Sequence, residues 1–194
     1  MLDRLDLNAI FYQHIHKENH HPKWRGIKIL KMPSDLILYA EAIDDKKPDV
    51  IVEIGTKFGG AALFFQDMID GKVVTIDIKS QVEKRDDRIK YIIGSSLDDT
   101  VFKKVCDICK HKKTMLVIDG NHGRKHVLKE LYRYHEIVTK GQYLVIEDCY
   151  VGRKLYGPGK ARNEFLKEHS GFKKTEHCSK YIVGVTLGGW LESD

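Results

Sequence analysis

The sequence predicts an α/β fold, in which a mostly parallel seven-stranded sheet carries helices on both faces. Short, continuous runs of apolar and β-branched residues recur along the chain, as expected for strands buried on both faces. Stretches with helical spacing of apolar residues alternate with these runs. A chain of 194 residues suffices for one domain with a full core. We therefore expect an N-terminal segment over residues 1–32 and a single domain over residues 33–194.

The predicted strands are apolar runs bounded by turn residues. Pro48 precedes the first run, Asp70-Gly71 marks the turn before the second, and Gly141 precedes the fifth. Most of the runs end at or next to an acidic residue, which matters for the site predicted below. The runs lie at residues 50–54, 72–77, 90–94, 114–119, 142–147, 172–177 and 181–187.

The predicted helices occupy the stretches between these strands. They lie at residues 35–43, 59–69, 97–112, 124–139 and 161–167. A glycine-rich connection over residues 149–159 precedes the last helix. Its glycines allow movement, and Tyr150 and Tyr156 could cover a substrate, so one interpretation is a lid. The other is a mobile connection with no role in chemistry.

The composition is that of a soluble globular protein, with 42% hydrophobic and 31% charged residues. The net charge of +5 is spread along the chain, so no nucleic-acid partner is expected. No apolar run approaches the roughly 20 residues of a membrane helix, and the acidic, polar start of the chain does not resemble a signal peptide. We expect no membrane association.

The cysteines and the N-terminal histidines show no recognisable metal or disulfide pattern. Four cysteines give no disulfide framework in a chain of this size, which favours a cytoplasmic location. Cys106 and Cys109 form a C-x-x-C inside a predicted helix, without a second such pair. The histidines of the N-terminal segment are interpreted as a solvated stretch; they are His14, His16, His20 and His21.

A glycine turn follows the first strand and predicts a site for a nucleotide-like ligand. Gly55, Gly59 and Gly60 separate the strand from an apolar helix, and such a turn lets the backbone approach a ligand closely at a helix N-terminus. The turn, with Thr56, is predicted to bind cofactor. A dinucleotide fingerprint requires G-x-G-x-x-G, but Lys57 occupies the place of its second glycine. The pattern E-x-G-x-x-x-G-G, beginning at Glu53, resembles motif I of class I S-adenosylmethionine-dependent methyltransferases.

Further cofactor contacts are predicted at the ends of the second and third strands. In parallel sheets, ligands bind beyond the carboxyl ends of the strands. Asp77 follows Gly55 at close to the roughly 20-residue spacing at which an acid meets ribose hydroxyls. This role suits the adenosine of either S-adenosylmethionine or a nicotinamide cofactor. Ser95 and Ser96 form a compact polar turn that could line the adenine.

Acids at the ends of the fourth and fifth strands predict a metal site. Asp119, Glu147 and Asp148 are hard oxygen ligands that suit Mg²⁺ or another hard divalent cation, with substrate oxygens completing the shell. A bound metal would lower the pKa of a coordinated hydroxyl. His122, three residues after Asp119, could then accept the hydroxyl proton as a general base. The alternative is that Asp119 caps the next helix and His122 is polar surface.

Several motifs in order along the chain resemble the cephalosporin hydroxylase / rhamnosyl O-methyltransferase family. Together they cover about residues 24–191, which makes them more specific than any one alone. They are Trp24-Arg-Gly26, Pro33-Ser-Asp35-Leu36, Lys47-Pro48-Asp49 through Gly55-Thr56, Asp119-Gly-Asn-His122, Tyr143 through Glu147-Asp148, Gly157-Pro158, Glu164-Phe165-Leu166 and Gly188-Gly189-Trp190-Leu191.

The resemblance implies a Rossmann-like class I methyltransferase fold, S-adenosyl-L-methionine as cofactor and a divalent metal near the transferred methyl group. By position it implies Glu53, Gly55 and Asp77 on the cofactor, with Asp119 also near it. It likewise implies a metal at Asp119, Glu147 and Asp148. His122 matches the histidine proposed as base in related metal-dependent sugar O-methyltransferases.

The function predicted from the sequence is O-methyl transfer from S-adenosylmethionine to a hydroxyl of a sugar or another polyhydroxylated small molecule. In this hypothesis Asp119 and His122 are catalytic. A nicotinamide-dependent oxidoreductase is the alternative enzyme, and a non-catalytic cofactor-binding protein of the same fold is the alternative from another class. A homo-oligomer is possible.

Overall fold

The computed structural model describes residues 4–17, 20–82, 85–151, 154–181 and 183–194. The elements in chain order are α1 (Arg4–Lys17), β1 (Lys23–Trp24), β2 (Ile27–Lys28), α2 (Pro33–Lys46), β3 (Val50–Ile54), α3 (Gly60–Met68), β4 (Lys72–Asp77), β5 (Lys90–Ile93), α4 (Asp99–Cys109), β6 (Thr114–Ile118), α5 (Arg124–Tyr134), η1 (His135–Ile137), β7 (Tyr143–Ile146), β8 (Tyr150–Val151), β9 (Lys154–Leu155), α6 (Gly157–Glu168), β10 (Phe172–Lys174), η2 (Glu176–Ser179) and β11 (Trp190–Ser193).

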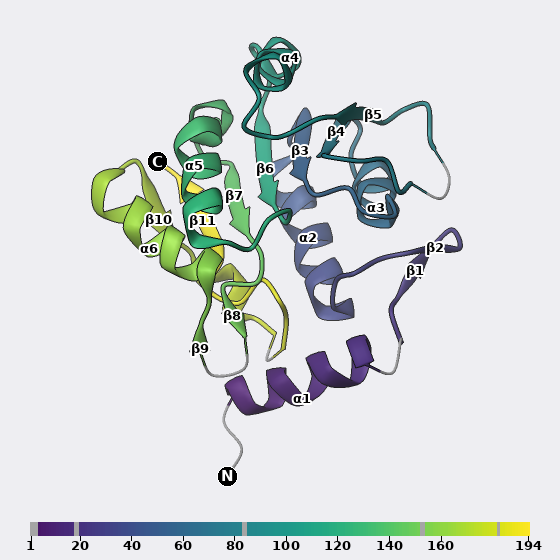
Figure 1. The fold of residues 1–194 in the computed structure, drawn as a ribbon, viewed down its shortest axis with the longest axis vertical. Coiled ribbons are helices and arrows are strands. Elements are labelled where there is room, and N and C mark those ends of the chain that lie inside the picture. Colours follow the sequence, from purple (N-terminus) through teal and green to yellow (C-terminus); the bar gives the residue numbers. More distant parts are fainter. Residues whose placement is uncertain (1–3, 18–19, 83–84, 152–153, 182) are drawn as a thin grey trace.

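Seven strands form the central sheet in the order β10-β11-β7-β6-β3-β4-β5 (Figure 1). The strands from β7 through β5 are parallel, whereas β11 runs antiparallel to β7, and β10 antiparallel to β11. The predicted mostly parallel seven-stranded sheet is confirmed.

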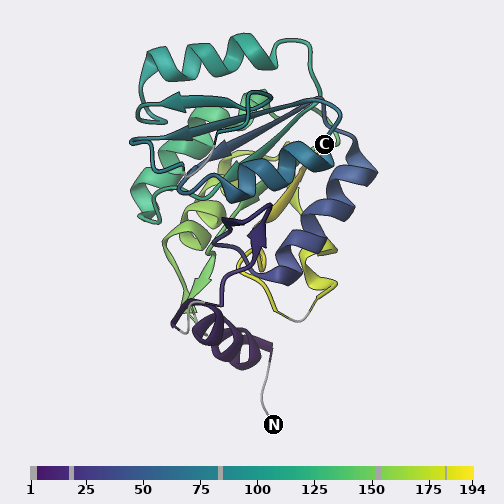
Figure 2. The same cartoon turned by 90° about the vertical axis from the view of Figure 1, so that its right-hand side faces the viewer.

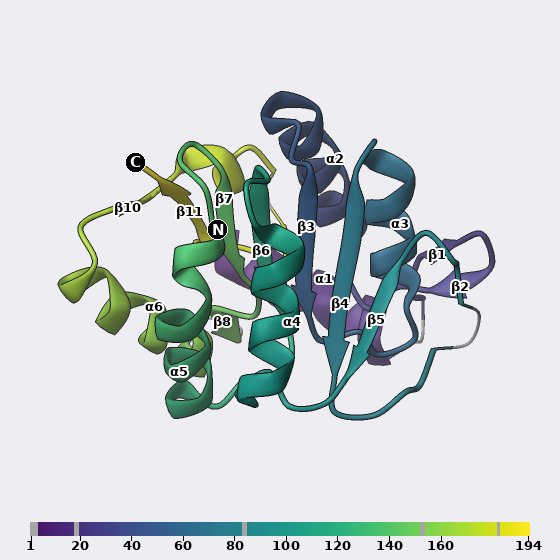
Figure 3. The same cartoon turned by 90° about the horizontal axis from the view of Figure 1, so that it is seen from above.

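Helices cover both faces of this sheet, as predicted. Figure 3 shows α4, α5 and α6 on one face and α2 and α3 on the other. Each face has its own cluster of buried apolar side chains. Every residue of β3, a run of β-branched residues around one acid, is buried. A strand buried on both faces needs this continuous apolar character, which explains why these runs form the sheet.

The register of the parallel strands brings their carboxyl ends to one edge. Ile54 of β3 is paired with Ile76 of β4 and with Ile118 of β6, and Ile118 is paired with Ile146 of β7. The residues that follow these four strands therefore lie next to one another. This edge carries the site described below.

Residues before α2 pack against the domain. Ile27, Ile29 and Met32 are all buried, and Ile15 of α1 packs with Met32 and Val185. Helix α1, which the sequence did not predict, lies beyond the layers near the β8–β9 hairpin (Figures 1 and 2). The predicted boundary between residues 32 and 33 stays a prediction. None of the helices in the described ranges combines the length and apolar character needed to cross a membrane.

Three predicted elements differ from the structure. The strand predicted over 172–177 ends early, because β10 stops at Lys174 and Glu176–Ser179 form the 3₁₀ helix η2. The strand predicted over 181–187 is wrong, because residues 183–184 are irregular, residues 185–188 form a turn and the last strand is β11. Helix α6 begins at Gly157, inside the connection predicted over 149–159, and Pro158 stands in its first turn, where a missing N–H costs nothing. The rest of that connection contains the short β8–β9 hairpin, and residues 152–153 lie outside the described ranges.

Candidate active site

The glycine turn after β3 has the tight backbone that its sequence predicts. Gly55 has φ of 107°, and a Cβ there would lie 2.2 Å from the backbone oxygen of Asp119, so only glycine fits. Lys57 also adopts a left-handed conformation, with φ of 48°. Its backbone N–H donates to Oδ2 of Asp77 over 2.9 Å, which ties the turn to the end of β4.

Glu53 lies directly behind this turn with a side chain that is closed to water. Its Oε2 accepts a hydrogen bond of 2.7 Å from the Thr75 hydroxyl, which also lies 2.7 Å from the Thr56 hydroxyl. Its Oε1 is buried and has no hydrogen-bond partner in the described part of the chain. Burial raises the pKa of the Glu53 carboxyl to about 7. A cationic group that binds beside such a buried acid would stabilise its ionised form.

A cavity of about 520 Å³ opens at the carboxyl edge of the sheet. It brings together predicted cofactor residues from four strand ends, namely Gly55, Asp77, Ser96 and Asp119. A small adjoining hollow is lined by the remaining residues of the glycine turn and by Glu53, Lys31 and Asp119. Ser95 is the exception among the predicted residues, since its hydroxyl accepts a hydrogen bond from the backbone N–H of Leu97 and is not among those lining the cavity.

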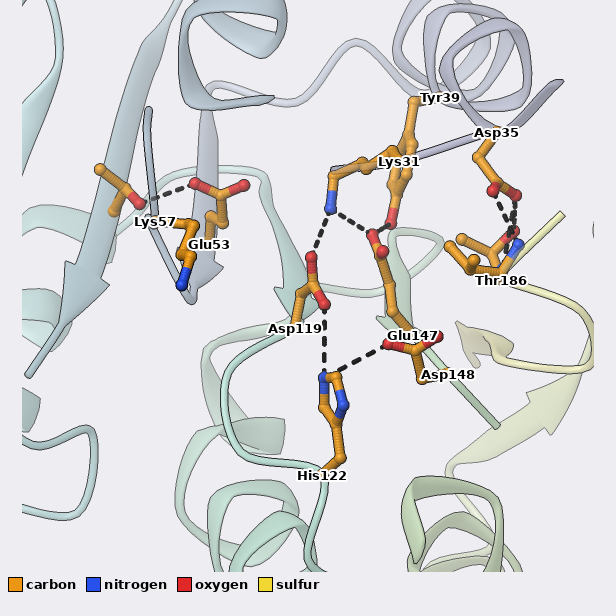
Figure 4. A network of polar contacts seen from close by, with 12 residues as sticks. Lys31, Asp35, Tyr39, Glu53, Lys57, Asp119, His122, Glu147, Asp148 and Thr186 are labelled. Atoms are coloured by element: carbon orange, nitrogen blue, oxygen red, sulfur yellow. Dashed lines mark hydrogen bonds and ion pairs between the residues drawn. The ribbon is translucent and has the colours of Figure 1, made fainter. Parts of the chain in front are cut away.

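Asp119, His122 and Asp148 converge on one point of this cavity (Figure 4). Nε2 of His122 lies 3.3 Å from Oδ2 of Asp148 and 3.7 Å from Oδ1 of Asp119. One potential ligand atom from each of the three residues lies within 4.8 Å of the others. The structure thus brings together both predicted catalytic residues and two of the three predicted metal ligands.

Lys31 provides a buried positive charge between two of the acids. Its Nζ donates to Oδ2 of Asp119 over 2.8 Å and to Oε1 of Glu147 over 2.6 Å, with the side chain only 1% exposed (Figure 4). Burial alone would lower the pKa of this ammonium, but the charges of Asp119, Glu147 and Glu53 hold the pKa above its usual value. The lysine therefore stays charged.

Glu147 faces this lysine and Tyr39. Its Oε1 also accepts a hydrogen bond of 2.6 Å from the Tyr39 hydroxyl, so two donors converge on one oxygen. Burial raises the pKa of Glu147, and the nearby charge of Asp119 adds to this effect. Its role as a metal ligand stays a prediction. Lys31 and Tyr39 were not predicted; the signal for Lys31 is a charged residue within the apolar stretch from Ile27 to Met32.

Asp148 occupies an unusual backbone conformation. Its φ is 53°, in the left-handed region that few non-glycine residues adopt. Its backbone N–H donates to the carbonyl of Val185 over 3.0 Å, which fixes this turn. Burial raises the pKa of the Asp148 carboxyl to about 6. Backbone strain of this kind concentrates at functional sites.

The carboxylates of Asp119 and Asp148 change the pKa of His122. Contact with Asp119 raises the pKa of the imidazole, and the charge of Asp148 adds to the rise, although burial opposes it. The side chain is 38% exposed and lines the cavity, while its Nε2 atom is buried between the two carboxylates. An imidazole with this environment can hold and release a proton near neutral pH.

The sheet order β5-β4-β3-β6-β7-β11-β10 and the glycine turn at its centre define the class, which is that of the class I S-adenosylmethionine-dependent methyltransferases. A family model described as Rhamnosyl O-methyltransferase/CmcI matches residues 16–193. The chain therefore belongs to this family.

Individual relatives agree with this assignment. The chain is 31% identical over 180 residues to a rhamnosyl O-methyltransferase of Mycobacterium leprae. The matched region covers 84% of this chain and 79% of the relative. It is 26% identical over 147 residues to a rhamnosyl O-methyltransferase of Mycobacterium bovis. Here the matched region covers 70% of this chain and 60% of the relative. A structure of CmcI described with Mg and SAM has the same fold, with a TM-score of 0.67, 21% identity and coverage of 89% of this chain and 76% of the other.

Proposed function

We propose that this protein transfers the methyl group of S-adenosylmethionine to a hydroxyl of a sugar or another polyhydroxylated small molecule, with a divalent metal ion. The observation that carries the proposal is the cluster of Asp119, His122 and Asp148 in the wall of the same cavity as the glycine turn. A methyl donor on the turn and a hydroxyl at the cluster would therefore be neighbours. Holding both reactants in this way is itself a large source of rate. The rhamnosyl O-methyltransferase relatives support a sugar as the acceptor.

The cofactor would be held by the residues predicted from the sequence. Asp77 would accept hydrogen bonds from the ribose hydroxyls in the main cavity, and the buried Oε1 of Glu53, at the adjoining hollow, would meet the α-ammonium group of the methionine end. The whole predicted set is Glu53, Gly55, Thr56, Gly59, Gly60, Asp77, Ser95, Ser96 and Asp119. The unpartnered Glu53 oxygen supports the fit, because a buried acceptor without a donor is costly until a ligand supplies one.

The donor atoms at the cluster suit a hard divalent cation such as Mg²⁺. Lys31 donates a hydrogen bond to Oδ2 of Asp119. The other oxygen, Oδ1, lies on the side of His122 and Asp148. Asp119 and Asp148 would hold the metal, and Glu147 is the third predicted ligand. When bound, a metal of this kind lowers the pKa of a coordinated hydroxyl and fixes its orientation.

His122 would accept the hydroxyl proton at Nε2. The nearby Asp119 and Asp148 stabilise the imidazolium that results. Because these carboxylates raise the pKa of His122, the neutral base becomes available as pH rises through that pKa, and turnover should rise with it.

A direct assay tests the proposal. Purified protein, S-adenosylmethionine and Mg²⁺ are incubated with a panel of glycosides, and products are screened by mass spectrometry for an added methylene unit. Calorimetry with S-adenosylmethionine and with NAD(H) runs in parallel. Binding of NAD(H) without binding of S-adenosylmethionine would overturn the proposal in favour of an oxidoreductase. Cofactor binding without any transfer to a broad acceptor panel would favour a non-catalytic protein.

The base assignment has its own test. His122→Ala should lower kcat by about a hundredfold to ten-thousandfold and leave the affinity for S-adenosylmethionine nearly unchanged. His111→Asn, a change at an exposed histidine in the turn just after α4, is the control. A matching loss of metal affinity in His122→Ala would show that the imidazole is a ligand instead.

Three further expectations stay predictions. These are a cytoplasmic location, a homo-oligomer and the absence of a nucleic-acid partner. The lid role of residues 149–159 is also a proposal. It is supported by the position of the β8–β9 hairpin directly after Asp148.

A further inference from the structure

Glu130 is a buried acid beside the main cavity that the proposed mechanism does not use. It lies on α5 with essentially no exposed surface, yet it is among the residues that line the cavity. Its Oε1 accepts a hydrogen bond of 2.5 Å from the hydroxyl of Ser96 and lies 3.2 Å from Nε2 of His126. These two contacts fix the carboxyl group firmly in place.

The other oxygen of this carboxyl group has no partner among the residues that the structure describes. Oε2 of Glu130 is buried and makes no hydrogen bond to any of them. The Ser96 hydroxyl donates to Oε1 and not to Oε2, and His126 also contacts Oε1. Leaving a buried acceptor without a donor costs free energy, so a group that enters the cavity with an N–H would be favoured at this oxygen.

The position of Glu130 within the cavity indicates which part of a ligand it would meet. Asp77 ends β4, and Ser96 follows the neighbouring strand β5, so a nucleoside with its ribose on Asp77 would extend its base toward Ser96 and Glu130. Ile78 lines the same cavity and is 72% exposed. An apolar side chain this exposed beside Asp77 offers a face for a flat base.

We propose that Oε2 of Glu130 accepts a hydrogen bond from the 6-amino group of the cofactor's adenine, and that Ser96 and His126 hold the carboxyl group in position for it. The inference rests on the proposed function, since it takes the adenosyl group as the ligand of this cavity. It adds a specificity-determining residue. A hypoxanthine base presents an oxo group at this position, and that acceptor would face the acceptor oxygen of Glu130.

A pair of ligands that differ only at this edge of the base provides the test, because hypoxanthine has a 6-oxo group beside N1–H where adenine has a 6-amino group beside an unprotonated N1. Calorimetry with S-adenosylhomocysteine and with S-inosylhomocysteine, which carries a 6-oxo group, measures the preference of each variant. Wild-type protein should prefer the adenosyl compound by about tenfold to a hundredfold, the range for a hydrogen bond to a charged group.

Glu130→Gln should abolish or reverse the preference for the adenosyl compound. The Ser96 hydroxyl and His126 would hold the amide oxygen, so the NH₂ group would point into the cavity and donate to the 6-oxo group. The preference for the adenosyl compound should therefore disappear or reverse, which a purely structural role would not produce. The matched control is Glu41→Gln on α2, since Glu41 also has one buried oxygen without a partner among the described residues but pairs with Lys180, outside the cavity.

Each outcome has one meaning. If wild-type protein binds neither ligand, the proposed function itself fails. If wild-type protein prefers S-adenosylhomocysteine and Glu130→Gln keeps the same preference, only the role of Glu130 is refuted. Ser96→Ala serves as the second variant if Glu130→Gln does not fold. It releases Oε1 and should reduce the preference at least threefold, whereas an unchanged preference refutes the inference.

Discussion

The ammonium group of Lys31 links the two halves of the acid cluster. It contacts Asp119 and Glu147 directly, and Glu53 adds a third negative charge nearby. Buried charges of one sign are tolerated only when a partner compensates them. This lysine therefore allows several acids to lie side by side before any metal binds.

Replacing Lys31 tests this role. Lys31→Met keeps much of the side-chain volume but leaves the buried carboxylates uncompensated. We expect the free energy of unfolding to fall by about 3–5 kcal/mol, the cost of removing one partner of a buried ion pair. Urea denaturation of metal-free protein measures the change.

Lys46→Met is the matched control for this experiment. Lys46 also bridges a carboxylate over 2.7 Å, that of Glu192, but both side chains are partly exposed. An exposed pair contributes about 1 kcal/mol or less. Equal losses in the two variants would contradict the compensating role of Lys31.

The raised pKa of Glu53 predicts a pH dependence of cofactor binding. The folded-state pKa of about 7 exceeds the usual glutamate pKa of 4.5, so the folded protein binds more protons than the unfolded chain between these values. Stability therefore falls as pH rises through this window, by an amount on the order of 3 kcal/mol for Glu53. A cationic cofactor group beside Glu53 favours the ionised carboxylate over the protonated acid. Affinity for S-adenosylmethionine should therefore rise as pH increases from about 5.5 to 8.

Calorimetry across this pH range measures the effect, with Glu53→Gln as the comparison. The amide cannot titrate, so the variant should bind weakly at every pH, with a flatter profile. Any slope that remains belongs to other groups, such as Asp148. An identical slope in both proteins would show that Glu53 does not control binding.

The predicted site residues that the structure brings to one cavity lie at or just beyond the ends of strands. This placement of Asp77, Asp119 and Asp148 could be predicted, because parallel strands buried on both faces bring their carboxyl ends to one edge. Lys31 and Glu130 could not. The sequence marks Lys31 only as a charged residue in an apolar stretch and Glu130 only as part of an amphipathic helix. Tertiary packing directs both side chains to the site.

At the scale of elements, helix α2 fixes the segment that was wrongly predicted as a strand. Val183, Val185 and Thr186 are β-branched, which predicts a strand over 181–187. In the structure the buried carboxylate of Asp35 accepts hydrogen bonds from the backbone N–H groups of Val185 and Thr186. A side chain on another element therefore satisfies donors that a neighbouring strand would otherwise pair.

Removing this acceptor should loosen the connection before β11. The carboxylate of Asp35 also accepts the Thr186 hydroxyl over 2.7 Å, so Asp35→Ala would leave three buried donors without a partner. We expect the free energy of unfolding to fall by about 2–4 kcal/mol and amide exchange at residues 185 and 186 to accelerate. Asp70→Ala, at an exposed turn, should change little, and equal effects in the two variants would contradict the role of Asp35.

At the scale of the whole molecule, the site joins parts that are far apart in the chain. Lys31 precedes α2, Asp119 follows β6, Glu147 follows β7, and Asp148 is hydrogen-bonded to Val185. A change in the charge balance at this point therefore acts on the segment before α2, the central strands and the segment before β11 together. Metal binding should be visible in the stability of the entire fold.

A thermal unfolding experiment tests this coupling. A ligand that binds only the folded state at 100 times its Kd stabilises the protein by about 2.7 kcal/mol. For a chain of this length, Mg²⁺ or Mn²⁺ should then raise Tm by about 5–10 °C over protein in EDTA. Asp148→Asn removes a ligand oxygen and should reduce the shift, whereas Asp70→Asn removes an exposed charge and should keep it. A shift of equal size in Asp148→Asn would place the stabilising metal elsewhere, and the absence of any shift in wild-type protein would refute the metal site.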